Sequence, residues 1–218
     1  MTFTPIDLAT WPRQQYFYYF TKMAPMSFTI SAKLDITNTY DALHANGLGF
    51  FPGYLYLTSQ VLTTMPEFRI GRNADGQLGY FDQLNPSYTV MHADHTIASC
   101  WSRYTPDFKT FAQHVHDDSE TAHQVLGPVG KPDQPINSFE AGMLPWVHFD
   151  SYTPLPVHGL PSFAPVLQAG QWQVVDGRRL MPLSITANHA VADGYHVSEL
   201  FNRLQVAFNQ PTWHQLDK

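Results

Sequence analysis

One histidine stands where an apolar strand pattern gives way to a helical one, and its surroundings suit proton transfer. His189 follows the run LSITA, and Asp193 and Gly194 precede a segment with helical spacing. Imidazole has an ordinary pKa near 6.5, so near neutral pH much of it is the free base that takes a proton from an attacking alcohol. Asp193 is placed to cap the helix or to pair with a cation that fixes the loop. The pattern alone leaves another interpretation open, a capped helix start with an incidental histidine.

Other candidate motifs give weaker patterns. His92 with His95, and His114 with His116, have spacings that suit a metal, but no cysteine or carboxylate completes a ligand set. We therefore predict no metal site. A lone G-x-G lacks the further glycine of a dinucleotide fingerprint, and neither a phosphate loop nor a G-x-S-x-G motif occurs. We expect no nicotinamide, nucleotide-hydrolase or serine-hydrolase chemistry.

The elements that must position His189 follow from hydrophobic periodicity. Apolar and polar residues alternate over 27–36, the period of a half-buried strand. Further strands are predicted at 69–73, 77–81, 88–92, 96–102, 144–152, 163–167, 171–175 and 180–190, with turns at Asp75-Gly76 and Asp176-Gly177. Helices are predicted from Pro12 to residue 20, over 40–46, from Pro52 to residue 65, over 106–124 and across 197–208. This order predicts an α/β (α+β) two-layer sandwich, a mostly antiparallel mixed sheet covered by helices.

Composition limits the classes of function. The 218 residues fit a single domain, and a net charge of −6 with no basic cluster argues against nucleic-acid binding. No apolar run reaches the roughly 18 residues of a membrane helix, and the N-terminal segment lacks the pattern of a signal peptide. We therefore do not expect the chain to bind a membrane. Its single cysteine cannot form an intrachain disulfide, which agrees with a cytoplasmic location. The 14% aromatic content suits a ligand pocket or a subunit contact.

Longer segments carry a family resemblance. The H-x-x-x-D-G string beginning at His189 is shared by chloramphenicol acetyltransferases and by the catalytic domains of dihydrolipoamide acyltransferases. HAVADGYHVSELFNRLQ resembles the closing segment of the chloramphenicol acetyltransferases, and LPWVHFDSY resembles their other signature. WPRQQYFYYF and SFTISAKLDI resemble their first helix and strand. The resemblance covers essentially the whole chain, and it implies one acetyltransferase domain over 1–218 with that family's fold.

The resemblance also implies roles for individual residues. His189 would be the general base that takes the proton of the primary hydroxyl of chloramphenicol as its oxygen attacks acetyl-CoA, a co-substrate; no cofactor would be bound permanently. Asp193 and Arg13 would form a buried ion pair that supports the catalytic loop. The acceptor pocket would include Phe20, Met26, Phe28, Thr89, Cys100 and Tyr152, and Trp146 and Trp172 would lie near the path of CoA. The family forms a homotrimer with sites between subunits, so the same assembly is implied here.

Two positions depart from the family pattern. The family's oxyanion-stabilising serine, three residues before the Pro-Trp pair, is Gly142 here, and a threonine that assists through water is Gln168. Loss of an oxyanion donor costs about 10² to 10³ in rate. Two alternatives therefore stay open: an acyltransferase for a different hydroxyl acceptor, and a weakly active or non-catalytic homologue that binds ligand.

Overall fold

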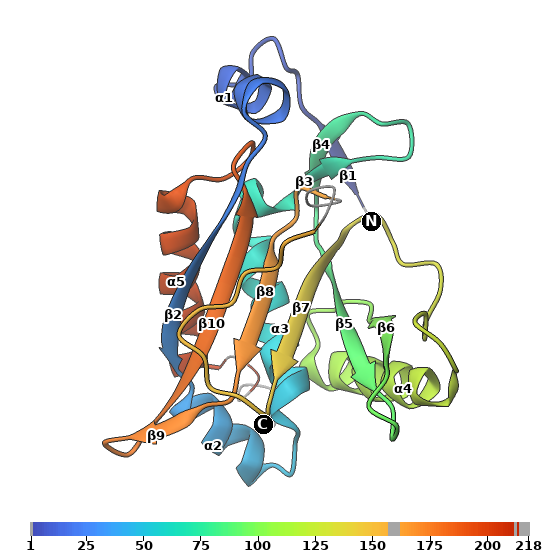
Figure 1. Ribbon diagram of the computed structural model, residues 1–218, viewed down its shortest axis with the longest axis vertical. Helices are drawn as coiled ribbons and strands as arrows, with labels where there is room; N and C mark the ends of the chain where they lie inside the picture. Colours follow the sequence, from blue (N-terminus) through green and yellow to red (C-terminus); the bar gives the residue numbers. More distant parts are fainter. Residues whose placement is uncertain (1, 157–161, 212, 214–218) are drawn as a thin grey trace.

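The chain folds around a seven-stranded mixed sheet (Figure 1). The computed structural model describes residues 2–156, 162–211 and 213. The strand order is β2-β10-β8-β7-β5-β6, and β9 pairs with the start of β10. β7 runs parallel to both β8 and β5, and the other pairs are antiparallel. The strands are β2 Ser27–Asp35, β5 Asn85–Met91, β6 Ile97–Trp101, β7 Ser138–Leu144, β8 Val166–Gly170, β9 Gln173–Val175 and β10 Arg178–Asn188.

Helices cover one face of this sheet (Figure 1). They are α2 Thr37–Ala45, α3 Phe50–Thr63, α4 Phe108–Gln124 and α5 Gly194–Asn209. α5 buries Val197, Leu200 and Leu204 at the predicted helical spacing. β10 contributes Leu183 and Ile185 to the same core, and both are inaccessible to solvent. The predicted sandwich, a mostly antiparallel mixed sheet covered by helices, is confirmed.

The face of the sheet turned away from the helices is polar. On β2 and β10, Thr29 Oγ1 lies 2.7 Å from Thr186 Oγ1, and Ser31 Oγ lies 2.6 Å from Ser184 Oγ. Successive side chains of a strand point to opposite faces, so these hydroxyls lie on one face, where Ser184 and Thr186 are buried and Ser184 accepts from the Tyr152 N–H. We call it the open face.

A smaller, three-stranded sheet and the first helix lie at one end of the large sheet, together at the top of Figure 1. The small sheet has the order β1-β4-β3, with β1 Phe3–Pro5, β3 Ile70–Arg72 and β4 Leu78–Phe81, and a 3₁₀ turn η2 Pro66–Arg69 precedes it. α1 Gln14–Tyr18 continues into one π-helical turn, η1 Tyr19–Met23. No helix of the described ranges is long and apolar enough to cross a membrane.

The strand predicted at 144–152 is wrong. β7 ends at Leu144, and the residues after it form a turn and irregular structure. Pro145 explains the end of the strand, because it has no N–H to donate to a ladder. The strand predicted at 163–167 is likewise displaced to β8, which begins directly after Pro165. β2 follows its predicted bounds, but Ala32, expected on a buried face, is exposed because β2 lies at the sheet edge.

Candidate active site

His189 is held at the end of β10 between two aromatic rings. Its backbone N–H donates to Met26 O at 3.0 Å, which ties the residue to the start of β2. The Phe20 ring stacks on the imidazole with centroids 4.0 Å apart and planes 6° apart, and Phe28 lies at 4.9 Å on a tilted plane. The rotation of the imidazole is therefore restricted on both sides.

One nitrogen of this imidazole is enclosed, and the side chain as a whole is partly exposed. His189 Nδ1 is buried and makes no hydrogen bond, and it lies 3.2 Å from Asp193 Oδ1. The side chain keeps 25% of its exposure. It borders an open cavity of about 550 Å³ that Gln15, Tyr16 and Tyr19 also line. A substrate group can approach the ring from that side.

Arg13 fixes the loop that carries His189. Its Nη1 and Nη2 donate to the two carboxylate oxygens of Asp193, each at 2.7 Å. Nε donates to Ala190 O and Nη2 to His189 O, both at 2.9 Å. These hydrogen bonds from Arg13 lower the pKa of Asp193, although partial burial opposes the shift. The side chains are 15% and 40% exposed, so the ion pair is half-buried rather than buried as expected.

His196 is a second support of this loop that the sequence did not single out. The Asp193 N–H donates to His196 Nδ1 at 3.0 Å, and His196 Nε2 lies 3.9 Å from Glu67 Oε1. Asp193 is the N-cap of α5, and His196 is its third helical residue. That spacing is the signature of a capping box, in which a side chain three residues on returns to the N-cap N–H, and it could have identified the residue.

Gly142 and Gln168 are direct neighbours on β7 and β8. A side-chain carbon added to Gly142 would overlap Oε1 of Gln168, with the rest of its carboxamide close behind. Gln168 Nε2 donates to Ala169 O at 3.3 Å. The Gln168 side chain thus fills the space that a serine at position 142 would take.

The predicted acceptor residues separate into two groups. The Phe20 and Phe28 rings contact the imidazole of His189, whereas Met26 contacts it through its backbone carbonyl and has an exposed side chain. Thr89 is exposed on β5, and the Tyr152 N–H donates to Ser184 Oγ on the open face at 3.2 Å.

Cys100 does not join that group. It is 1% exposed and lies in the core beside Tyr88, whose hydroxyl reaches Val115 O on α4. Burial raises the pKa of the Cys100 thiol. The side chain therefore faces the helices, whereas the acceptor residues named above lie by His189 or on the open face.

The two tryptophans predicted near CoA have different surroundings. Trp172 packs against Tyr40 and Phe50, with ring centroids 5.2 and 5.5 Å away. Trp146 is 63% exposed beside the end of β7. Among the described residues, no group of three or more His, Cys, Asp or Glu side chains is placed to hold a metal ion.

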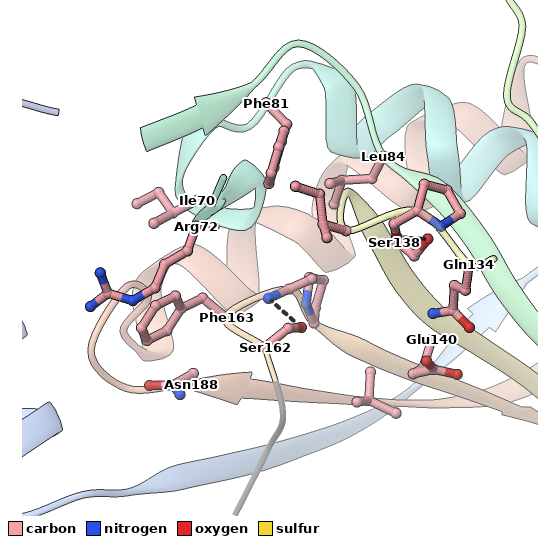
Figure 2. A pocket seen from close by; sticks show the side chains of 16 residues that line it. Ile70, Arg72, Phe81, Leu84, Gln134, Ser138, Glu140, Ser162, Phe163 and Asn188 are labelled. Atoms are coloured by element: carbon pink, nitrogen blue, oxygen red, sulfur yellow. Dashed lines mark hydrogen bonds between the residues drawn. The ribbon is translucent and has the colours of Figure 1, made fainter. Parts of the chain in front are cut away.

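A second cavity, of about 540 Å³, lies between the small sheet and the adjoining ends of β7, β8 and β10 (Figure 2). Asn188, which precedes His189, lines it, and so does Glu140 of β7. No motif in the sequence pointed to Glu140, because the pairing of strands distant in sequence brings it there.

Comparisons with known proteins identify the family. The family described as chloramphenicol acetyltransferase matches residues 1–205. "Chloramphenicol acetyltransferase 2" of Haemophilus influenzae is 37% identical over 210 residues, which span 94% of this chain and 97% of the relative. A Clostridium perfringens chloramphenicol acetyltransferase is 32% identical, with 98% of each chain covered.

Solved structures agree on the fold. A chloramphenicol acetyltransferase superposes with a TM-score of 0.82 at 23% identity, over 96% of this chain and 100% of the other. A dihydrolipoamide acetyltransferase of Azotobacter vinelandii superposes less closely, with a TM-score of 0.69 at 19% identity over 96% and 97% of the two chains. On the family match and the sequence relatives together, the chain belongs to the chloramphenicol acetyltransferase family.

Proposed function

We propose that this chain transfers the acetyl group of acetyl-CoA to the primary hydroxyl of chloramphenicol. The observation that carries the proposal is the state of His189. One ring nitrogen is enclosed beside Asp193, the His189 side chain borders a cavity, and two aromatic rings contact the imidazole. A base for an alcohol needs an accessible nitrogen in a fixed direction, and this arrangement supplies one.

In the proposed reaction, His189 takes the hydroxyl proton as the alcohol oxygen attacks the thioester carbonyl. The tetrahedral intermediate then expels the CoA thiolate, which recovers the proton from the imidazolium. The Asp193 carboxylate, 3.2 Å from Nδ1, stabilises the imidazolium in between. Arg13 keeps that carboxylate ionised and in place through its two hydrogen bonds.

The developing oxyanion needs a donor about 2.7–3.1 Å away. We propose that the carboxamide of Gln168 supplies it, because that group occupies the space beside Gly142. Its Nε2 now donates to a backbone carbonyl at 3.3 Å, a long hydrogen bond that can be exchanged for a charged acceptor. Gly142 gives Gln168 the room it needs.

We further propose that 1–218 act as one acetyltransferase domain in a cytoplasmic homotrimer. Phe20, Phe28, Thr89 and Tyr152 would contact the acceptor from one subunit or its neighbour, and Trp146 and Trp172 would lie along the path of CoA. The support for this assembly is the family to which the chain belongs. Light scattering should give the mass of a trimer, and an active monomer at assay concentration would contradict this assembly.

Release of the CoA thiol, measured with and without chloramphenicol, tests the reaction directly. We expect thiol release that depends on chloramphenicol, with a product heavier by one acetyl group. If other primary alcohols support release and chloramphenicol does not, the acetyl-transfer chemistry stands and the acceptor is wrong. If no alcohol supports it, the proposed reaction is wrong.

A further inference from the structure

The helix that carries Phe20 changes its geometry where it meets His189. α1 is an α-helix to Tyr18, and the next turn, η1, is π-helical, with the Ala24 N–H donating to Tyr19 O at 2.9 Å. A π turn closes its hydrogen bond over five residues in place of four, so it holds one residue more than an α turn. Since successive residues of an α-helix are about 100° apart around its axis, side chains after this turn face a different direction from those of a continuous α-helix.

This turn determines two contacts to the proposed base. Within it, the Phe20 ring stacks on the imidazole of His189 with centroids 4.0 Å apart. After it, the Met26 carbonyl accepts the His189 N–H at 3.0 Å. Tyr19, also in the turn, lines the cavity that the imidazole borders. The conformation of residues 19–26 therefore decides how the imidazole is held and what stands beside it, and π-helical turns are frequent at functional sites.

A threonine hydroxyl ties this turn to the helix before it. Thr21 Oγ1 donates to Phe17 O at 2.6 Å, four residues back, and more weakly to Tyr18 O at 3.4 Å. Phe17 is 8% exposed and belongs to the core. A hydroxyl that bonds to the carbonyl four residues back often bends a helix, because it adds a partner to a carbonyl of the helical ladder. The bond from Thr21 therefore joins the turn that carries Phe20 to a residue fixed in the core.

We propose that Thr21 is a positioning residue for the base: its hydroxyl stabilises the π-helical turn that keeps Phe20 stacked on His189. The proposal rests on the proposed role of His189 in acetyl transfer, and Thr21 acts through Phe20. Without the hydroxyl, the turn returns more easily to α-helical geometry, which moves Phe20 off the imidazole. A misplacement of about 1 Å in an active site can cost about a hundredfold in rate, so a partial loss of order at this turn should lower kcat.

Thr21→Val tests the proposal, because valine keeps the shape of threonine and has no hydroxyl. Thr121→Val is the matched control: on α4, Thr121 Oγ1 makes the same bond four residues back, to Asp117 O at 2.8 Å. Thr21→Ser restores the hydroxyl and is the rescue variant. Thiol release gives kcat and the KM of acetyl-CoA, and urea unfolding shows that each variant is folded.

NMR reports the stacking without turnover. The ring proton resonances of His189, assigned by their absence in His189→Ala, are shifted by the ring current of a stacked phenyl group. Phe20→Leu removes that ring and gives the reference for an imidazole that is not stacked. The position of these resonances between the parent and Phe20→Leu therefore measures how far each variant keeps the stack.

In Thr21→Val, we expect kcat to fall by about threefold to tenfold while the KM of acetyl-CoA changes by less than about twofold. The His189 resonances should move towards those of Phe20→Leu. Thr21→Ser should restore both readouts, and Thr121→Val should match the parent in both. Parent-like resonances in Thr21→Val, or a loss of kcat that serine does not restore, would overturn the proposal. Resonances that move as expected in a protein whose parent releases no thiol would contradict the acetyl transfer alone.

Discussion

The two halves of the candidate site differ in how many hydrogen bonds hold their side chains in place. The loop after β10 is fixed by many bonds: Arg13 makes four hydrogen bonds to it, two to Asp193 and one each to two backbone carbonyls, and His196 holds the Asp193 N–H. The proposed oxyanion position lies elsewhere on the sheet, where Gln168 pairs with Ser184, five residues before His189. There β7 and β8 carry a glycine beside a glutamine whose side-chain donor makes one long bond, at 3.3 Å.

The difference follows from what each half must do. A base has to stay within a few tenths of an ångström of one proton, so its support tolerates little change. An oxyanion donor must come within about 2.7–3.1 Å of the developing charge, but its side chain can differ, and a longer side chain on the next strand can supply the donor in place of a serine. We infer that this chain keeps the half that takes the proton and rebuilds the half that stabilises charge.

The largest expected effect is at His189. His189→Ala should lower kcat by about a hundredfold to ten-thousandfold, because proton abstraction is lost while packing changes little. His116→Ala is the matched control, since that histidine is exposed on α4. Stopped-flow or steady-state thiol release and a thermal melt separate chemistry from folding. A His189→Ala protein that turns over acetyl-CoA at the parent's rate would show that His189 is not the general base.

Arg13 should show the next largest effect, on stability and activity together. Breaking a buried ion pair costs about 3–5 kcal/mol, but the Asp193 side chain is 40% exposed, so we expect about 2–3 kcal/mol for Arg13→Ala. Asp193→Asn should cost less, since Arg13 keeps its two bonds to backbone carbonyls. Urea unfolding measures both. Equal losses in the two variants would mean that the carbonyl bonds contribute nothing.

The same ion pair gives a pH dependence with a defined sign. The folded state lowers the pKa of Asp193 below its ordinary 3.8, mainly through the hydrogen bonds from Arg13. The stabilisation is therefore complete above pH 3.8 and is lost as the pH falls from there through the lowered folded pKa. Unfolding followed at successive pH values below 4 should show a steeper loss of stability in the parent than in Asp193→Asn. If the free energy of unfolding fell equally steeply with pH in both proteins, the lowered pKa of Asp193 would be contradicted.

The better-fixed half was also the half that the sequence predicted well. Its elements are local: an apolar strand pattern, the Asp193-Gly194 start and the apolar spacing of α5 all lie within one continuous segment. Arg13 came only from the family resemblance, because no periodicity joins positions 180 residues apart.

The other half depends on pairings between distant strands. β7 was misplaced because residues after Leu144 alternate as a strand would, while Pro145 ends the ladder. Because the strand was predicted at 144–152 and not at Ser138–Leu144, the sequence could not indicate the face of the sheet on which Glu140 lies. The pocket role of Cys100 came only from the family resemblance, and in the structure its side chain lies in the core, 1% exposed.

Gly142 gives a sharper test of the rebuilt half. Gly142→Ser alone should leave kcat unchanged or lower it, because the new side chain must displace Gln168. The double variant Gly142→Ser, Gln168→Thr restores the family pattern and should recover kcat to the parent's level or above. Gln168→Ala should lower kcat by about tenfold or more if its carboxamide is the donor. A rise of about an order of magnitude in Gly142→Ser alone would mean that no donor replaces the serine.

The smallest expected effect concerns His196, which supports the fixed half without touching substrate. His196→Ala removes the acceptor of the Asp193 N–H and should lower the free energy of unfolding by about 1 kcal/mol, as the loss of a helix cap does. Activity should fall only a few-fold, because the four bonds from Arg13 still hold the loop. His196→Gln should restore stability and kcat together, since glutamine is the usual acceptor at this position of a capping box. Urea unfolding and kcat, measured on both variants, decide the matter. If glutamine fails where histidine succeeds, the contact that matters is the 3.9 Å approach of Nε2 to Glu67, and Glu67→Gln should then reproduce the defect.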